Sequence, residues 1–460
     1  MSRDSDRHRR HRTVHRRDVL KAAGGTLALA AAGGVASADD TTTEVSVADP
    51  LATASPSSKI APTDGFADTD WTAEGPLAVV RVTNLDAEGP GSLRDAMTRD
   101  VDAAGRVVVF EVGGVIDLDG QGLDPETDNV FVAGQTAPDP GVTVVRGTVE
   151  VDATNVVVQH VRVRTGTEVT GDNSGEGEAA DSITVQDESE NVILDHVTAS
   201  WGTDENMSAG DTCSRLTFSN SLVAHALAAP GFHPDDDPEH SNGTLIGHDT
   251  DEMAILGNLY AHNVDRNPRL KGGTSTVVAN NVVYDFDNTT GLGDDAEQPP
   301  TEASIVGNTY RPGPDTPFTG SDTDPVVFTY EDDPDPIHVY LDDNVLQGDL
   351  QLLQDTPKIT RVDAPPLWPD GLGPDAAHQP FGRVLNAAGA RPVARTELDA
   401  QVVHETRSRS GGVIDNEGDL GGYPDLPSTE RALDVPKEEF GAWLDRHTRA
   451  VEVHGRGRER

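Results

Sequence analysis

The segment Val277-Val278-Ala279-Asn280-Asn281 decides the fold, because it is one copy of a pattern that recurs along the middle of the chain. Each copy is a short apolar run that ends in asparagine or histidine and is followed by a second apolar stretch. The final residues of successive copies lie 36, 24, 38, 23, 27 and 36 positions apart. These residues are His160, His196, Asn220, Asn258, Asn281, Asn308 and Asn344.

Intervals near 23 residues match one triangular coil of a parallel β-helix, and the longer intervals match a coil that carries an inserted loop. Asparagine suits the turns of such coils, because it tolerates left-handed backbone and its amide can bond to the asparagine of the next coil. Signals for hairpin turns and antiparallel alternation, which an immunoglobulin-like sandwich requires, are weak. The pattern therefore predicts an all-β, single-domain right-handed parallel β-helix, a solenoid.

The overall composition agrees with many short strands. Aromatic residues make up only 4% of the chain, whereas it contains 46 glycines and 30 prolines. Such a composition argues against a helical bundle and favours strands joined by tight turns. Cys213 is the only cysteine, which excludes an intrachain disulfide and is expected to be a small buried side chain.

Residues 1–38 are typical of an export signal. The segment Arg16-Arg17-Asp18-Val19-Leu20-Lys21 is a twin-arginine motif, residues 22–35 form an apolar stretch too short to span a bilayer stably, and Ala36-Ser37-Ala38 resembles a cleavage site. We therefore expect a twin-arginine signal peptide and a secreted, extracellular protein without a membrane span. Residues 39–74, rich in Thr, Ser, Ala and Asp, predict a disordered leader.

The net charge of the chain is -44 at pH 7. Removing residues 1–38, with eight Arg/Lys and three Asp/Glu, takes away a net +5 and leaves about -49. Charge of this size destabilises a compact state unless salt screens it, and at molar salt the Debye length is roughly 3 Å. We therefore expect a halophilic, archaeal source, a monomer, and no binding to nucleic acid.

A basic strip interrupts the acidic chain. The segment His262-Asn263-Val264-Asp265-Arg266-Asn267-Pro268-Arg269-Leu270-Lys271-Gly272-Gly273 carries three cations within six residues, which suggests an anionic ligand. The alternative is that the cations form surface ion pairs with nearby carboxylates. Pro268 fixes its own φ and pushes Asn267 towards an extended conformation, so Arg266 and Arg269 leave a stiff segment.

Within this strip, Arg266-Asn267-Pro268-Arg269-Leu270-Lys271 closely resembles the Arg-x-Pro-x-x-Arg/Lys signature of the pectate lyases of polysaccharide lyase family 1. Residues 91–96, 107–116 and 133–138 are similar to the opening coils of the same enzymes, and residues 388–426 to their C-terminal part. The resemblance covers roughly residues 75–430, although 290–370 match only as generic coils. This range is the expected lyase domain, followed over 431–460 by a C-terminal helix at 437–448 and a basic tail.

The resemblance implies roles for the basic residues. Arg266 matches the arginine that is the catalytic base of the family. Arg269 and Lys271 are implied to bind substrate, and Lys271 would act as a point charge where the family often has a second arginine. The substrate-binding lysine of the family falls near His240, which could bond to a uronate carboxylate or simply close a loop.

The resemblance also implies Ca²⁺ as cofactor. The Asp-x-Asp calcium motif of the family aligns with Ala179-Ala180-Asp181, so Asp181 is kept and Ala179 has lost the second ligand. Asp204 and Glu205 fall where further ligands belong, and Asp204 fits slightly better than Glu205.

Three other motifs have plainer interpretations. Asp195-His196 matches a strand-ending Asp-His of the family, for which we expect a structural turn network. His233 and the acids of 235–239 could chelate a metal, but a solvated loop is the simpler interpretation in so acidic a chain. Gly247-His248-Asp249 loosely resembles a Gly-His motif of polygalacturonases.

The implied reaction is calcium-assisted β-elimination of pectate, an acidic polysaccharide. The base removes the C5 proton of a uronate while the C4 oxygen leaves, and a cation must stabilise the developing enolate-like charge. Arginine normally stays protonated, so activity should rise steeply into alkaline pH if Arg266 is the base.

Two alternatives stay open. A polygalacturonase-like hydrolase would need two carboxylates opposed across the bond, and no paired Asp-Asp segment precedes His248. A non-catalytic uronan-binding β-helix is compatible with the missing carboxylate at Ala179. The sequence does not choose among uronans, nor between endo and exo action.

Overall fold

The computed structural model describes residues 43–48, 51, 55–169, 180–229, 240–293, 298–317, 325–329, 336–373 and 380–453. The expected signal peptide, Ala179 and the acidic run at 235–239 lie outside these residues.

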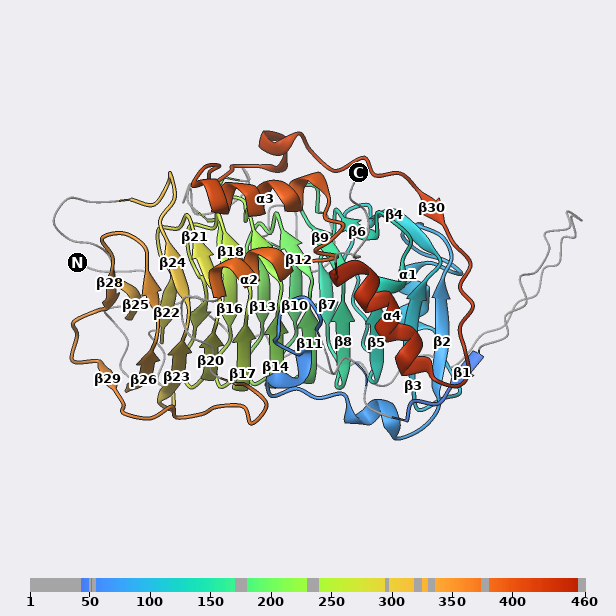
Figure 1. Ribbon diagram of the computed structural model, residues 1–460, viewed down its shortest axis with the longest axis horizontal. Coiled ribbons are helices and arrows are strands. Elements are labelled where there is room, and N and C mark those ends of the chain that lie inside the picture. Colours follow the sequence, from blue (N-terminus) through green and yellow to red (C-terminus); the bar gives the residue numbers. More distant parts are fainter. Residues whose placement is uncertain are drawn as a thin grey trace, which may run out of the picture. The chain divides into compact units, whose positions relative to one another are not determined.

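Three sheets form the described part of the chain (Figure 1). The 12-stranded sheet contains, in spatial order, β1 (Thr43–Val45), β2 (Leu77–Val82), β3 (Gly105–Phe110), β5 (Val130–Ala133), β8 (Val156–Gln159), β11 (Glu190–Asp195), β14 (Ser214–Ser219), β17 (Asp251–Leu256), β20 (Ser275–Ala279), β23 (Thr301–Val306), β26 (Ile337–Asp342) and β29 (Ile359–Arg361). The 8-stranded sheet contains β7 (Val149–Val151), β10 (Ile183–Val185), β13 (Glu205–Ala209), β16 (Asn242–Ile246), β19 (Arg269–Leu270), β22 (Thr290–Leu292), β25 (Pro325–Thr329) and β28 (Gln351–Leu353). The 10-stranded sheet contains β30 (Thr429–Glu430), β4 (Val112–Asp117), β6 (Val142–Val145), β9 (Val161–Arg164), β12 (Thr198–Ser200), β15 (Leu222–Ala224), β18 (Leu259–Ala261), β21 (Val282–Tyr284), β24 (Thr309–Arg311) and β27 (Val345–Leu346).

The chain visits the sheets in turn, so each coil adds one strand to each sheet. For example, β17, β18 and β19 follow one another along the chain and pair in parallel with β20, β21 and β22 of the next coil. Antiparallel pairing occurs only where β1 meets β2 and β30 meets β4, within the described residues. Because parallel strands lie about 4.8 Å apart, equivalent positions of consecutive coils stack directly. The predicted parallel β-helix is confirmed.

The turn between the 12-stranded and 10-stranded sheets shows the expected asparagine ladder. The Asn258 N–H donates to Asn281 Oδ1 at 2.8 Å, the Asn281 N–H donates to Asn308 Oδ1 at 2.9 Å, and the Asn308 N–H donates to Asn344 Oδ1 at 3.0 Å. However, these asparagines are not the left-handed residues. That conformation belongs to the preceding residue, as at Gly257 (φ 66°).

The sequence analysis assigned the left-handed backbone and the ladder hydrogen bond to the same asparagine. In the structure, two neighbouring residues divide these roles. In the earlier coils the aligned residues His160, His196 and Asn220 occupy the left-handed position itself, with φ of 57°, 50° and 50°. The sequence alignment was thus shifted by one residue between these coils and the later ones.

The inside of the β-helix holds the largest apolar cluster, and smaller clusters fix the helices on its outside. At the N-terminal end, α1 (Leu93–Thr98) buries Leu93, Ala96 and Met97 in the core, and Ser92 caps it by accepting a bond from the Asp95 N–H at 3.2 Å. Short 3₁₀ turns complete the secondary structure: η1 (Pro62–Asp64), η2 (Asp70–Ala73), η3 (Gly134–Thr136) and η4 (Glu417–Leu420).

Two helices cover the outer face of the 10-stranded sheet. Apolar residues of α2 (Pro380–Ala387) and α3 (Glu397–Ser408) pack on β15, β18 and β21 (Figure 1). In the first turn of α3, Asp399 accepts a bond from Arg162 Nε at 2.9 Å and pairs with Arg164, and all three side chains are buried. This buried charge group fixes the orientation of α3 on the sheet.

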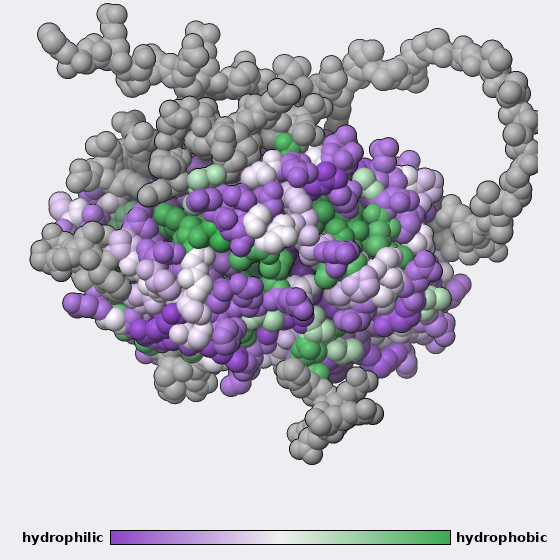
Figure 2. All heavy atoms as spheres, turned by 90° about the horizontal axis from the view of Figure 1, so that it is seen from above, coloured by the Kyte–Doolittle hydropathy of each residue, from purple (hydrophilic) through white to green (hydrophobic). Residues whose placement is uncertain are grey.

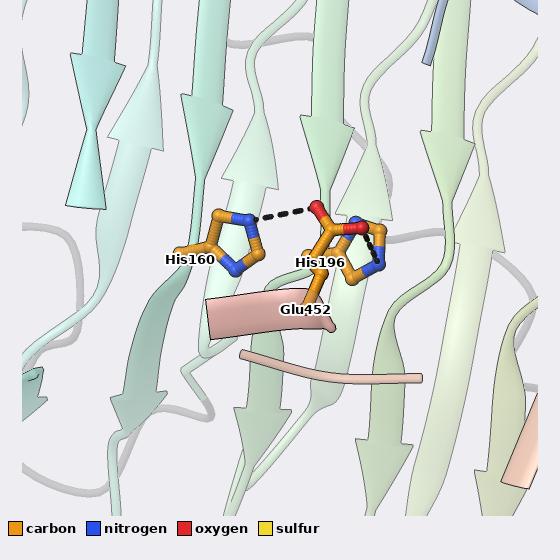
Figure 3. A group of neighbouring side chains, drawn as sticks. All are labelled: His160, His196 and Glu452. Atoms are coloured by element: carbon orange, nitrogen blue, oxygen red, sulfur yellow. Dashed lines mark ion pairs between the residues drawn. The ribbon is translucent and has the colours of Figure 1, made fainter. Parts of the chain in front are cut away.

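The C-terminal helix α4 (Phe440–Glu452) packs Phe440, Trp443 and Leu444 on the 12-stranded sheet. The sequence placed this helix at 437–448. The carboxylate of its last residue, Glu452, bridges two histidines that stack on each other (Figure 3), with Oε1 3.2 Å from His160 Nε2 and Oε2 3.7 Å from His196 Nε2. His196 Nδ1 lies 3.0 Å from Asp195 Oδ2, and Asp195 also bonds to neighbouring coils, so the predicted turn network is confirmed.

The described residues between 43 and 74 differ from the disordered leader that composition predicted. β1 pairs with β2, and Leu51 and Trp71 are 3% and 6% exposed. Ile60 packs against Ala254 and Leu256 on the outside of the 12-stranded sheet. Most of the large apolar residues in the described part of this polar segment are spaced so that they are buried on the β-helix wall, which a composition average does not show.

The surface fits the acidic composition. On the face shown in Figure 2, the described residues are mainly hydrophilic, with hydrophobic residues in smaller groups among them. Val453 is the one large hydrophobic residue that the described part of the chain exposes, at 43%. Cys213 is buried, as expected.

Candidate active site

Stacked coils bring the candidate acids together at the start of the 8-stranded sheet. Asp181 lies two residues before β10, and Glu205 is the first residue of β13. Glu205 pairs in register with Asn242 of β16, which forms a bridge to Asp265. Segments far apart in sequence therefore present equivalent positions side by side.

Asp181, Asp204 and Glu205 form one group of carboxylates. Each offers an oxygen, and these oxygens lie within 4.8 Å of one another. Asp181 Oδ1 accepts a bond from the Glu205 backbone N–H at 2.9 Å, and the Ser208 hydroxyl bonds to Asp181 Oδ2. Burial, and next the charge of Asp204, raise the pKa of the Asp181 carboxyl to about 8. Crowded carboxylates of this kind gain from a cation between them.

Arg266 reaches into this group. Its Nη1 contacts Glu205 Oε1 and lies 3.5 Å from Asp204 Oδ1. The Glu205 side chain is 4% exposed and that of Arg266 21%, so the pair is largely shielded from water. The guanidinium of Arg266 therefore supplies positive charge beside the three carboxylates.

The backbone around Arg266 is held firmly. Arg266 has left-handed backbone (φ 57°), and its N–H donates to Asp265 Oδ1 at 2.7 Å. Asn267 is 1% exposed, and its amide Nδ2 donates to Asn263 O and Asn288 O at 3.1 and 3.0 Å. The Asn267-Pro268 peptide is cis. The stiffness expected from Pro268 thus has a second source, the buried amide of Asn267.

His240 completes the group. Its Nε2 lies 2.9 Å from Asp204 Oδ1, and its backbone N–H donates to Ala228 O at 3.0 Å. It therefore both closes a loop and contacts an acid of the carboxylate group. Burial raises the pKa of the neighbouring Asp265 carboxyl, although the Arg266 N–H, Arg269 and His240 oppose this.

Comparison with known proteins assigns the chain to a family. A probable pectate lyase C of Aspergillus flavus is 32% identical over 362 residues, which are 75% of this chain and 77% of the relative. A probable pectate lyase C of Aspergillus terreus is 33% identical over 359 residues, with the same coverage. The chain belongs to the pectate lyase family.

Solved structures agree on the fold. The major allergen of cedar pollen, jun a 1, aligns with a TM-score of 0.50 and 14% identity over 68% of this chain and 88% of that one. No protein-family model matches the chain. Family membership thus depends on the curated pectate lyases, and the structural likeness bears on the fold alone.

Not every residue that the pectate lyase resemblance suggested joins the group. Arg269 and Lys271 lie on and just after β19, where Arg269 pairs in register with Leu245 and the Lys271 N–H donates to Ile246 O. Arg269 acts on the pKa of Asp265, but the ion pairs that define the group involve Arg266 and His240.

Sequence reasoning missed two residues of this candidate site. Ser208 bonds to Asp181, and Asp265 holds the Arg266 N–H. Asp265 could have been predicted from the sequence, because it directly precedes Arg266. No pattern singles out Ser208, whose role depends on the register between β10 and β13.

Proposed function

We propose that this chain cleaves pectate by β-elimination, with Asp181, Asp204 and Glu205 holding Ca²⁺ and Arg266 removing the C5 proton. The observation that carries the proposal is the contact of Arg266 with two of three clustered carboxylates, in a chain of the pectate lyase family. The names of the curated relatives suggest pectate as substrate.

The donor set fits calcium. All three side chains offer carboxylate oxygens, the ligands that this hard cation prefers. The pKa of Asp181 is raised because burial and the charge of Asp204 outweigh the opposing effects of the Ser208 hydrogen bond and the Arg266 charge. When bound, Ca²⁺ would supply positive charge that neutralises the uronate carboxylate and stabilises the enolate-like charge that develops during elimination.

We assign to Arg266 the role of base at C5. Glu205 and Asp204 favour its protonated form, because opposite charges nearby stabilise the guanidinium. Base action therefore requires that these two carboxylates bind Ca²⁺ in the working enzyme and no longer pair with Arg266. The firmly bonded backbone of Asn267 keeps the guanidinium at a fixed place while this happens.

His240, Arg269 and Lys271 are proposed to bind the uronate chain. His240 already contacts Asp204 at the edge of the carboxylate group, and Arg269 acts on the adjacent Asp265. His240 lies one coil from Glu205, and Arg269 and Lys271 lie two coils from it. Positive side chains on successive coils suit successive carboxylates of a polyuronate, because stacked coils repeat at about 4.8 Å.

The hydrolase alternative loses its support. It depended on a motif around His248, whose Nδ1 lies 3.2 Å from Asp211 Oδ1. The relatives that match the chain are named as lyases and not as hydrolases. The binding-only alternative is what the experiment below distinguishes.

We also propose that the chain is exported through its twin-arginine segment and works in concentrated salt as a monomer, with residues 1–38 as signal peptide, 75–430 as lyase domain and 431–460 as a C-terminal helix and tail. The support is the twin-arginine motif and the net charge of -44. Within the described residues, no helix is long and apolar enough to cross a membrane.

The test is the product formed from polygalacturonate in molar salt. A lyase yields an unsaturated uronide that absorbs in the ultraviolet, whereas a hydrolase yields reducing ends without that absorbance. We expect absorbance with Ca²⁺, none after chelation, and a loss of at least about 100-fold in Asp181→Asn. Asp425→Asn, the same change at an exposed position, should behave as the parent. Reducing ends without absorbance, or binding without turnover, would contradict the proposal.

A further inference from the structure

A second group of potential metal ligands lies apart from the proposed active site and shares no residue with it. His225 follows β15 and His262 follows β18, so they occupy the same position in consecutive coils, with φ of 55° and 57°. Their rings stack with centroids 4.7 Å apart. Glu405 of α3 reaches them from outside the β-helix.

The three side chains converge on one point. Glu405 Oε2 lies 3.3 Å from His262 Nε2 and 4.0 Å from His225 Nε2, and the ligand atoms lie within 4.8 Å of one another. In a tetrahedral zinc site with bonds of 2.0–2.1 Å, ligand atoms are about 3.3 Å apart. The His262–Glu405 distance already has this value.

The histidine rings must turn slightly to share an ion. They are nearly parallel, with 8° between their planes, and the lone pair of a ring nitrogen lies in the plane of its ring. The last torsion of a histidine side chain has a broad energy well, so each ring can rotate towards the other at small cost.

Several buried polar atoms of this group have no hydrogen-bond partner outside the group, within the described part of the chain. They are both ring nitrogens of His225, Nε2 of His262 and Oε2 of Glu405. The side chains of His225 and His262 are only 3% and 0% exposed. An unsatisfied buried polar group is unfavourable, and a single cation would satisfy three of these atoms together.

The surroundings support His262 as a ligand. Its Nδ1 lies 2.8 Å from Asp285 Oδ2, and Asp285 in turn accepts a bond from the Asp315 N–H at 2.8 Å. A carboxylate at Nδ1 places the proton there and leaves the Nε2 lone pair facing Glu405, as in many metal sites.

A glycine closes the group from outside. Gly411 has φ of 86°, and a Cβ there would lie 2.6 Å from Glu405 Oε2 and 2.9 Å from His262 Cε1. The backbone after α3 therefore approaches the group as closely as only glycine permits.

The similar group at His160, His196 and Glu452 provides a contrast (Figure 3). There, His160 Nδ1 accepts a bond from the Arg391 N–H at 3.2 Å, which places the ring proton on Nε2, facing Glu452. Glu452 Oε2 accepts bonds from the Ser57 N–H and hydroxyl at 3.1 and 2.9 Å. Glu452 Oε1 and His160 Nε2 lack other partners here too, but Glu452 Oε2 is engaged and His196 Nε2 lies 3.1 Å from the Ser57 hydroxyl. This group therefore does not leave three ligand atoms open to one cation.

We propose that His225, His262 and Glu405 bind one divalent transition-metal ion of the zinc class, which ties α3 to two consecutive coils. Two imidazoles and a carboxylate suit zinc better than calcium, which takes oxygen ligands. Two buried carboxylates, Glu405 and Asp285, supply the negative charge that offsets such an ion.

The experiment uses the full chain, stripped with a chelator and dialysed against Zn²⁺ or Co²⁺ with Ca²⁺ in excess. Bound metal per chain is measured by elemental analysis, the geometry by the visible absorption of Co²⁺, and the melting temperature with and without Zn²⁺. We expect one Zn²⁺ per chain, a tetrahedral Co²⁺ spectrum, and a rise in melting temperature. Glu405→Gln and His225→Gln should each abolish all three effects.

Glu452→Gln, the same change in the other group, is the matched control and should keep all three. Asp181→Asn should also keep them, so that the outcome is separate from that of the proposed lyase activity. Should His225→Gln fail to fold, the less buried Glu405→Gln still decides. Absence of stoichiometric zinc in the parent, or equal zinc retention in Glu405→Gln and Glu452→Gln, would overturn the proposal.

Discussion

At the scale of single residues, Arg266 has two incompatible tasks. In the described arrangement it neutralises Glu205 and Asp204, whereas in the proposed enzyme those carboxylates hold calcium. The guanidinium and the metal ion therefore compete for the same oxygens.

This competition predicts the effect of Arg266→Gln on calcium binding. Removing the guanidinium should tighten calcium binding about tenfold, which corresponds to about 1.4 kcal/mol. Isothermal titration calorimetry without substrate measures this independently of activity. Arg269→Gln, an equal change in charge three residues after Arg266, should alter the affinity less than about twofold in molar salt, where screening is strong. Equal shifts in both variants would show that only net charge matters.

Site residues were predictable from the sequence where a motif of the pectate lyase resemblance marks them, and not where a distant helix without such a motif supplies them. Arg266 and its acidic neighbours followed from the Arg-x-Pro signature and the aligned acids, and the structure brings them together. Glu405 and Glu452 did not, because each meets its histidines from a helix more than 140 positions further along the chain. Nothing local in either helix marks these glutamates.

At the scale of elements, the asparagine ladder is the part of the turn that stabilises the coil stack. Asn281 Nδ2 donates to Ile255 O at 2.9 Å, and its Oδ1 accepts the Asn258 N–H. Asn281→Ala leaves these two buried backbone groups unpaired and should cost roughly 2–4 kcal/mol in free energy of unfolding.

Chemical denaturation measures this cost. The control is Asn280→Gly, which changes the neighbouring left-handed residue (φ 61°) to one that tolerates that conformation, and should cost much less. If the two substitutions prove equally costly, the division of roles between the two positions is incorrect.

The ion-pair group of Glu452, His160 and His196, which holds the end of α4 on the β-helix, predicts a pH range in which the fold is most stable. Burial favours neutral His196, but Asp195 and Glu452 outweigh it and raise the pKa of His196 from 6.5 to about 9. Its contribution to stability is complete below pH 6.5 and is lost as the pH rises through about 9. Burial likewise opposes the charged form of Glu452, but His196 and His160 lower its pKa from 4.5 to about 2.

The Glu452 contribution is therefore complete above pH 4.5 and lost as the pH falls through about 2. This ion-pair group stabilises the fold most between these limits, at pH 4.5–6.5. There, Glu452→Gln should lower the free energy of unfolding by roughly 3 kcal/mol, as expected for breaking a buried pair. Thermal unfolding of both proteins from pH 3 to 10 tests this; a difference that stays constant across the range would contradict it.

The fold was predictable at this scale because the repeat is periodic, but its boundaries were not. The run that ends at Asn281 shows the strand and the turn, yet no local feature tells that Asn280 carries the left-handed backbone and Asn281 the ladder. Likewise, Trp71 and Ile60 find their partners only after the wall of the β-helix exists.

At the scale of the whole molecule, the net charge of -44 predicts that the stability of the fold depends on salt. The Debye length grows from about 3 Å at 1 M to about 30 Å at 0.01 M salt, so repulsion among the surface carboxylates spreads as salt is diluted. We expect the melting temperature to fall continuously on dilution. KCl and NaCl at equal ionic strength should act alike, whereas an effect confined to one of them would indicate a specific ion site in place of screening.

The proposed mechanism also depends on the whole molecule, because the stacked coils bring Arg266, the proposed base, to the carboxylates of the proposed metal site. The most direct test is the initial rate of unsaturated product from polygalacturonate, with calcium in molar salt, for the parent and Arg266→Lys between pH 6 and 10. We predict a parent rate that rises steeply with pH and a loss of at least about 100-fold in Arg266→Lys at every pH, with substrate binding retained. A parent rate that is flat with pH, or a variant nearly as active as the parent, would contradict Arg266 as the base.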